Sequence, residues 1–488
     1  MPDFPERIGA LARLHCASAD SLRRIDKKDP GLGMSLTPPK VSLSASSPAN
    51  ATPKRGAAFL AWLKRAWVPV VLVGVALLSC TIVTLNHSHQ LSAYDEWVYY
   101  DAVTKVPTQG IVHQGEYIGE PALEEMACFG DPYGARGEKC TGPKGDYSDH
   151  AVYPLGGKTT ADIYAPVYFD ITWVVAQPIR WVTGLDLLTA ARLTGFFWLG
   201  AGLIAFYALT RELKIHRLTA LGLGLVAIGT VPSMYAFTYI TTDAPCFLVG
   251  AGLLYLGVRF VRGTFSGWWL IPLSALAVLL KITNIFAVGL LALYMLIYAI
   301  MKRKQDFSSR DRAPAPPRIV LIAVLYTVAA LVAEVLWLAI RSAISIGPGP
   351  NQGINSPLSI RGLASQLTTF IGFNSAYTVD GAVMLPYAVL TITGVFGFLM
   401  TVRGRGIKRA LSISTAVAVV FFPPILVVAM GIALGSAFPV STRYSAPLMP
   451  AILVAIGFMI QNKAWRYILL SYGAALVAIE IARSFYLP

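Results

Sequence analysis

Two adjacent carboxylates, Asp95 and Glu96, follow the first strongly apolar block of the sequence, within Tyr94-Asp95-Glu96-Trp97. Acids beside aromatic rings at a membrane surface are poorly solvated. A partly shielded carboxylate there can act as a general base that takes the proton from an attacking hydroxyl. The competing interpretation is a solvated helix start, where acids favour the positive end of the helix dipole. The local pattern leaves both interpretations open.

Two further charged residues, Asp243 and Lys281, lie at the ends of apolar blocks. Asp243 belongs to Thr241-Thr242-Asp243-Ala244-Pro245, a pattern typical of a helix N-terminus. It is expected to cap that helix, to line one cavity with the acid pair, or to do both. Lys281 separates two apolar runs, and an intramembrane ammonium is costly unless paired. It is therefore a candidate for holding a phosphate, with a snorkelling side chain at a helix end as the alternative.

Arg443 and Tyr444 precede a late apolar block, within Ser441-Thr442-Arg443-Tyr444. A guanidinium suits phosphate because its planar fork donates two parallel hydrogen bonds. An interfacial anchor is the competing interpretation. Arg341, at the end of another apolar block, is a weaker candidate of the same kind, and Glu334 within that block is expected to pair with a cation.

Cys128 and Cys140 flank a loop rich in Gly, Pro and charge, where a disulfide is predicted if the loop faces an oxidising compartment. His113 and His150 lack metal-ligand spacing and are interpreted as surface residues. The sequence contains no phosphate-binding Gly loop, nucleophile elbow or nucleotide-binding fingerprint. An activated substrate is therefore expected to arrive through the membrane rather than as a cytosolic nucleotide.

The composition predicts a membrane protein. Of 488 residues, 55% are hydrophobic and 14% charged, against roughly 25% charged in soluble domains. The apolar residues form blocks of about 18–25, the length that crosses a bilayer. The net charge of +14 resides in short clusters between these blocks. This arrangement follows the positive-inside rule and argues against a nucleic-acid partner.

Hydropathy predicts an all-α polytopic protein with about eleven transmembrane helices, the first of which doubles as the targeting signal. Each predicted inner connection carries at least two Lys or Arg residues, so the N-terminus is expected inside and the C-terminus outside. The block 267–280 is short and, with the next block, predicts a broken helix. The predicted spans are 67–86, 188–210, 218–238, 244–261, 267–280, 282–301, 318–341, 383–402, 411–434, 445–461 and 466–484.

Around these spans, residues 1–66 are expected to form a disordered cytoplasmic tail, in which Met34 is a candidate second start. Residues 67–301 are predicted as an N-terminal catalytic module and 302–488 as a C-terminal module. Each contains a long outer segment, 87–187 and 342–382 respectively. Helices lying along the membrane interface are expected near 163–181 and 358–373.

Several short elements occur in an order that is known from a family. They are Asp95-Glu96, Ala165-Pro166-Val167-Tyr168-Phe169, Ala190-Ala191-Arg192-Leu193, Thr241-Thr242-Asp243-Ala244, Leu280-Lys281 and Thr442-Arg443-Tyr444 with Pro447 and Pro450. In this series, mainly over residues 90–300, the chain resembles the C-type membrane glycosyltransferases (GT-C-like fold). The resemblance is to the branch of protein O-mannosyltransferases and lipid A aminoarabinose transferases. Ala165 stands where the family usually has Pro, and Thr442 where related proteins have Gly.

The resemblance implies an inner (plasma) membrane enzyme with an extracytoplasmic site. It would transfer a sugar from a polyprenyl-phosphate donor to an envelope glycan, lipid or protein, with inversion of the configuration at the anomeric carbon. Asp95 would be the base and Glu96 its assistant. Lys281 and Arg443 would hold the lipid phosphate, with Asp243, Tyr444, Arg341 and Tyr168 as further substrate-binding candidates. No cofactor is implied, and a metal-free mechanism is favoured over a divalent metal.

Two other classes remain open. A transporter or flippase of lipid-linked glycans would show internal repeats and mid-membrane polar residues, of which Glu334 is an example. An O-antigen polymerase or ligase would carry its long functional loop late in the chain, whereas here the longest outer loop is the first.

Overall fold

The computed structural model describes residues 55–87, 89–92, 95–132, 134, 137–142, 145–303, 313–350, 359–370, 381–401, 406–434 and 440–485. The chain divides into two compact units, Met1–Ala57 and Ala58–Pro488, and the arrangement below is that of the second unit. Residues 1–54 lie outside the described residues, so the disordered tail stays a prediction. Helix α1 (Arg55–Asn86) begins before the predicted boundary, and its apolar part is Ala66–Asn86.

Regular structure in the described part of the second unit is helical, apart from an isolated β-bridge between Tyr117 and Lys158. Helices suit a chain this apolar because they satisfy all their backbone hydrogen bonds internally. The remaining α-helices are α2 (Glu96–Lys105), α3 (Glu120–Phe129), α4 (Val167–Thr183), α5 (Leu187–Leu193), α6 (Gly195–Glu212), α7 (Arg217–Ile228), α8 (Val231–Thr238), α9 (Cys246–Val261), α10 (Leu270–Leu280), α11 (Ile285–Arg303), α12 (Pro316–Ala343), α13 (Ile360–Phe370), α14 (Gly381–Thr401), α15 (Ile407–Leu434), α16 (Met449–Met459) and α17 (Lys463–Arg483). Short 3-10 helices include η3 (Ala161–Ile163), η5 (Ile282–Asn284) and η7 (Thr442–Ser445).

The prediction of a multi-span helical membrane protein is confirmed. Among the described residues, six helices are long and apolar enough to cross a membrane, or seven if the bent pair α7–α8 is one span. The other predicted spans coincide with shorter apolar helices, Cys246–Val261, Gly267–Leu280, Ala388–Gly397 and Met449–Met459. The count of eleven crossings and the orientation therefore stay predictions.

One predicted span, 218–238, is not a continuous helix. The chain leaves helical geometry at Thr230, which is extended, and α7 and α8 meet at 67°. Pro232 lies in the first turn of α8, where its missing N–H costs nothing because the first N–H groups of a helix have no partner within it. The bend follows from this local restart of the helix.

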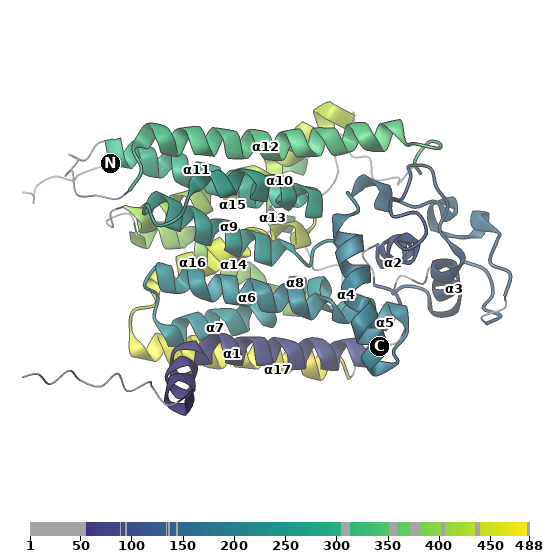
Figure 1. Cartoon of the computed structure of the whole chain (residues 1–488), viewed down its shortest axis with the longest axis horizontal. Helices are drawn as coiled ribbons and strands as arrows, with labels where there is room; N and C mark the ends of the chain where they lie inside the picture. Colours follow the sequence, from purple (N-terminus) through teal and green to yellow (C-terminus); the bar gives the residue numbers. More distant parts are fainter. Residues whose placement is uncertain are drawn as a thin grey trace, which may run out of the picture. The chain divides into compact units, whose positions relative to one another are not determined.

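The long helices run side by side (Figure 1) and pack as α7 with α17, α6 with α9, α10 with α12, and α11 with α15. Residues 67–301 and 302–488, which the sequence divides into two modules, thus interleave in one unit. The segment containing α2, α3, α4 and α5 gathers at one end of these helices (Figure 1).

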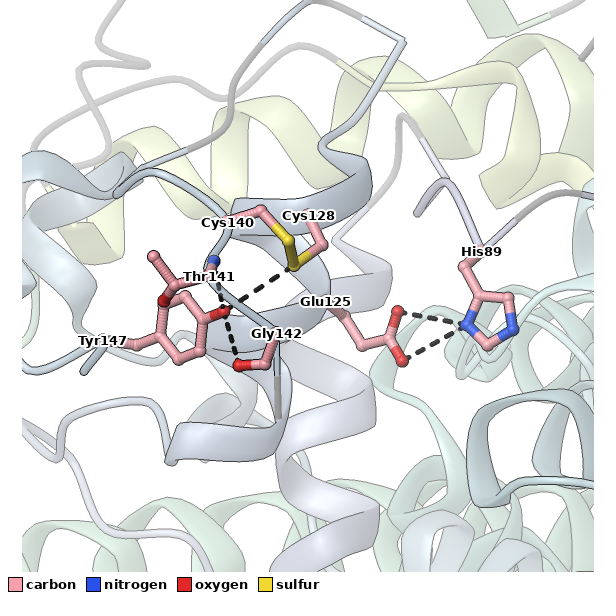
Figure 2. Close-up of a disulfide and its surroundings, with 7 residues drawn as sticks. All are labelled: His89, Glu125, Cys128, Cys140, Thr141, Gly142 and Tyr147. Atoms are coloured by element: carbon pink, nitrogen blue, oxygen red, sulfur yellow. Dashed lines mark hydrogen bonds and ion pairs between the residues drawn. A yellow bond between two sulfur atoms is a disulfide. The ribbon is translucent and has the colours of Figure 1, made fainter. Parts of the chain in front are cut away.

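Within that end segment, α4 corresponds to the helix expected near 163–181. It begins after Pro166 and ends at Gly184, whose left-handed conformation is typical of a helix C-terminus. Beside α3, Cys128 and Cys140 form a disulfide, as the sequence predicts. The Tyr147 hydroxyl lies against Cys128 and donates a hydrogen bond to the Gly142 carbonyl at 3.0 Å (Figure 2).

Candidate functional site

Asp95 and Arg443, which are 348 positions apart in the sequence, form an ion pair at the start of α2. Arg443 Nη2 lies 2.9 Å from Asp95 Oδ2. The Asp95 side chain is 46% exposed, whereas that of Arg443 is 14% exposed. The Asp95 carboxylate is therefore half accessible, and the guanidinium with which it pairs is largely buried.

The pairing continues from Arg443 to a second acid and a second cation. Arg443 Nη1 lies 3.6 Å from Asp243 Oδ2, and Asp243 Oδ1 accepts a hydrogen bond from Lys281 Nζ. Lys281 and Asp243 are both buried. Charges in such a place persist only when paired and hydrogen-bonded. We call these four residues the charge cluster: Asp95, Arg443, Asp243 and Lys281 alternate in sign.

Each member of the charge cluster lies where its helix begins or breaks. Asp95 directly precedes α2, Asp243 precedes α9, and Arg443 lies in η7 before α16. Lys281 adopts an extended conformation between α10 and η5. The predicted break at this lysine is therefore present, and Asn284 Nδ2 stabilises it by donating to the Ala277 carbonyl at 2.9 Å.

Aromatic rings surround the cations. Lys281 Nζ lies 5.4 Å from the Tyr444 ring centroid and 6.0 Å from that of Tyr164. The Arg443 guanidinium lies 5.4 Å from the Tyr444 centroid. The quadrupole of each ring attracts such cations. Burial raises the pKa of Tyr164 and of its hydrogen-bond partner Tyr99, so both phenols stay neutral.

Tyr168, another predicted substrate-binding residue, forms a hydrogen bond with the backbone close to Asp243. Its hydroxyl accepts a hydrogen bond from the Thr241 amide at 3.0 Å. The Thr241 hydroxyl donates in turn to Asp243 Oδ2 at 3.1 Å. Tyr168 therefore orients the segment that carries Asp243.

Glu96 is fully buried and its carboxylate is saturated. It accepts two hydrogen bonds from Arg192, at 2.8 Å from both Nε and Nη2. It also accepts from the amides of Ser92 at 2.8 Å and Ile240 at 2.9 Å. This bidentate pair ties α2, α5 and the segment before α9 together, so Glu96 fixes the position of its neighbour Asp95.

Arg341 pairs with a carboxylate of the protein itself, which argues against the predicted phosphate-binding role. Its Nε lies 2.7 Å from Asp162 Oδ2. Four residues earlier on α12, Trp337 Nε1 donates to the Ile163 carbonyl at 3.0 Å. These contacts attach the end of α12 to η3, next to Tyr164.

No role is predicted from the sequence for Arg192, Tyr164 or Tyr99. Arg192 could have been suspected, since it is a charged residue within an apolar block and belongs to one of the short family-like elements. Tyr164 and Tyr99 carry no such signal, because aromatic residues are frequent throughout this chain and only tertiary contacts distinguish these two.

An apolar groove of about 280 Å³ reaches Leu280, the last residue of α10. Its lining comes from α4, α6, α9 and α10, and it includes Trp198, Val249, Gly252 and Leu280. Leu280 directly precedes Lys281 in the chain, and none of the four residues of the charge cluster is among those that line the groove. An elongated hydrocarbon with an anionic head matches this combination.

No group of three or more His, Cys, Asp or Glu residues that could hold a metal ion occurs within the described ranges. Arg443 pairs with both Asp95 and Asp243 through its two terminal nitrogens. What the chain's own residues offer is a half-exposed carboxylate beside two buried cations.

No protein-family model matches the chain, and no curated protein matches it. Among solved structures, it is similar to the oligosaccharyltransferase of Archaeoglobus fulgidus, crystallised tethered to an acceptor peptide that contains the NVT sequon. The TM-score is 0.38 at 14% identity, over 87% of this chain and 56% of that chain. The chain thus spans little more than half of the oligosaccharyltransferase. A likeness this distant assigns no family, and the proposals below rest on the chain's own residues.

Proposed function

We propose that the protein is a membrane glycosyltransferase of the GT-C type that takes its sugar from a polyprenyl-phosphate donor. The observation that carries the proposal is the charge cluster, together with an apolar groove that reaches Leu280, the residue before Lys281. The groove suits a hydrocarbon chain, the cations suit a phosphate, and the half-exposed Asp95 suits an acceptor hydroxyl. The acceptor is an envelope glycan, lipid or protein on the extracytoplasmic side.

In the proposed reaction, the acceptor oxygen attacks the anomeric carbon from the face opposite the phosphate. The Asp95 carboxylate takes the acceptor proton, the new C–O bond forms, and the bond from the anomeric carbon to the phosphate oxygen breaks with inversion. The electron pair leaves with the polyprenyl phosphate. Lys281 and Arg443 neutralise the charge that develops there, an electrostatic effect worth several kcal/mol in a water-poor site.

The Arg443 bridge suggests how donor binding prepares the base. In the structure Arg443 is shared between Asp95 and Asp243. A donor phosphate competes with Asp95 for the guanidinium, because phosphate offers it a bidentate pair. Asp95 then loses its cation, and its carboxylate is free to accept the proton of the acceptor hydroxyl. Glu96 keeps its role as the anchor of Asp95, and Tyr168 that of Asp243.

The test uses purified protein in proteoliposomes with a panel of radiolabelled polyprenyl-phosphate sugars. The wild type is expected to consume one donor. Lys281→Met and Arg443→Met should raise its KM by about tenfold or more, because each removes one phosphate partner. Lys158→Met is the matched control, since Lys158 also lies over a tyrosine ring, 5.7 Å from the centroid of Tyr117.

Arg443→Lys separates charge from geometry, since it keeps a cation but loses the bidentate fork. It should lie between the wild type and Arg443→Met. Unchanged donor kinetics in both Met variants, or the absence of consumption of every donor by the wild type, would refute the phosphate site.

A further inference from the structure

A second pocket, of about 190 Å³, lies away from the charge cluster among the ends of α1, α8 and α17. His87, Tyr235, Tyr239, Glu480 and Arg483 contribute to its lining. Unlike the groove, it is partly polar. None of these residues has a role in the proposed transfer reaction.

Glu480 contributes to this pocket a buried carboxyl group with spare hydrogen-bonding capacity. The Glu480 side chain is only 5% exposed, and its Oε1 has no hydrogen-bond partner among the residues that the structure describes. Its Oε2 lies 3.8 Å from Arg483 Nη1, a loose pair. A buried acceptor without a partner is unfavourable, so a ligand that donates a hydrogen bond there gains affinity.

The rings next to Glu480 form a stack. His87 lies on Tyr239 with centroids 4.2 Å apart, and Tyr235 follows at 5.6 Å from Tyr239. Burial, with the Arg192 charge, lowers the pKa of His87 to about 3, so its imidazole is neutral. The pocket therefore combines aromatic surface with one carboxyl group and one guanidinium.

This combination of groups selects among ligand classes. A phosphate would meet the Glu480 carboxylate, and a free ammonium would meet Arg483. A neutral sugar ring satisfies both groups, because each hydroxyl can donate to the carboxylate and accept from the guanidinium. Its C–H face packs on the aromatic rings.

We propose that this pocket is a second saccharide-binding site, separate from the site of transfer. The Glu96–Arg192 pair lies between the two sites. Arg192 binds Glu96 on one side, and on the other it lies 5.1 Å from the Tyr239 ring centroid and donates to the Gln90 carbonyl. The pocket would hold one unit of a glycan while another unit reacts, and its binding does not depend on the transferase reaction.

The test is equilibrium dialysis of the full-length protein in nanodiscs against radiolabelled methyl glycosides of hexoses and pentoses. We expect saturable binding of at least one glycoside. Glu480→Gln should weaken it about tenfold or more, because a charged acceptor is replaced by a neutral one. Tyr235→Ala, which truncates a partly exposed ring, should weaken it independently. Glu212→Gln, at a partly exposed ion pair elsewhere, is the control.

Binding is measured without any lipid-linked donor, so that failure of the transferase proposal leaves this one standing. Absence of binding by the wild type would overturn the second site. Binding that withstands both Glu480→Gln and Tyr235→Ala would also overturn it. Glycerophosphoethanolamine is the competing probe, and its Glu480-dependent binding in place of glycosides would identify a lipid headgroup and refute the saccharide.

Discussion

Asp95 adopts a left-handed backbone conformation, with φ 60° and ψ 14°. This conformation costs most L-residues roughly 1–2 kcal/mol, although Asp and Asn tolerate it best. The neighbouring Glu96 is held next to it by four hydrogen bonds to its carboxylate. Strain held in this way is frequent at functional sites. At the scale of single residues, the acid pair therefore divides into one anchor and one accessible group.

Asp95→Asn should reduce sugar transfer by about 100-fold or more, because general-base catalysis commonly contributes that much. Asn accepts the left-handed conformation, so the thermal midpoint should stay close to that of the wild type. Turnover of the consumed donor in proteoliposomes measures the effect. Asp186→Asn, which preserves the helix cap on Thr189, is the control. Full activity of Asp95→Asn would remove Asp95 from the mechanism.

Glu96→Gln should destabilise the protein by about 3–5 kcal/mol, because it leaves the buried Arg192 charge without its partner. The thermal midpoint in detergent, followed by tryptophan fluorescence, is the measurement. Glu212→Gln removes a carboxylate from the partly exposed pair with Arg262 and should change the stability by no more than about 1 kcal/mol. Equal effects of the two substitutions would argue against the anchoring role.

At the scale of elements, helix ends decide where the polar groups lie. The charge cluster is assembled from the starts of α2 and α9, from η7, and from the break after α10. Close backbone contact holds these ends in register. A Cβ placed on Gly250 of α9 would lie 2.1 Å from the Pro447 carbonyl oxygen, which follows η7. Small residues allow such approaches between membrane helices.

Gly250→Ala should therefore separate α9 from the segment that carries Arg443, and lower both stability and transfer activity. The loss of activity should exceed tenfold, because catalytic groups tolerate little displacement. Thermal midpoint and donor turnover are measured together. Gly74→Ala is the matched control, since a Cβ there meets no atom within 4 Å. A fully active Gly250→Ala variant would contradict the proposed register.

Asp101 in α2 is expected to make the stability of the protein depend on pH. Asp101 is buried, and it accepts hydrogen bonds from Lys105 Nζ at 2.8 Å and from the Gly119 amide at 2.7 Å. Burial raises its pKa to about 6, in spite of the lysine. The folded state therefore binds a proton between pH 4 and 6 that the unfolded state has released, and stability falls as the pH rises through this range.

The stability of the wild type, relative to Asp101→Asn, should therefore fall between pH 4 and 6 by roughly 2–3 kcal/mol. Thermal midpoints of both proteins across this range provide the measurement. A difference that grows in favour of the wild type would show that the lysine, and not burial, controls this carboxyl.

At the scale of the whole molecule, the distribution of Lys and Arg predicts which side each connection faces. The end segment with the disulfide and the charge cluster is expected outside, and the start of α17 inside. Helices from both halves of the sequence pack into one unit. One topology measurement therefore places the entire site relative to the membrane.

Substituted-cysteine labelling tests this topology in a Cys16→Ser background. An exposed Asp146→Cys should react with a membrane-impermeant maleimide in intact cells. Lys463→Cys, at the start of α17, should react only after permeabilisation. Cys80 and Cys246 are buried and should not interfere. The reverse pattern would place the charge cluster in the cytoplasm and exclude an extracytoplasmic lipid donor.

The amino-acid sequence alone predicted a multi-span helical membrane protein, the positions of most of its apolar helices, and the charged residues of the cluster. Asp95, Asp243, Lys281 and Arg443 were all recognisable, because a charge at the edge of an apolar block is costly and therefore conspicuous. Glu334 and Arg341 carried the same signal, which shows its limit: the pattern identifies charged groups that need a partner without identifying the partner.

Tertiary structure alone decided the partners. It separated Glu96, saturated by Arg192 from 96 positions away, from Asp95, paired with Arg443 from 348 positions away. It assigned Arg341 to Asp162 and bent α7 away from α8. It also formed the groove and the pocket around Glu480. Each of these depends on which helix faces meet, and local sequence cannot specify them because side-chain contacts between distant segments set their energies.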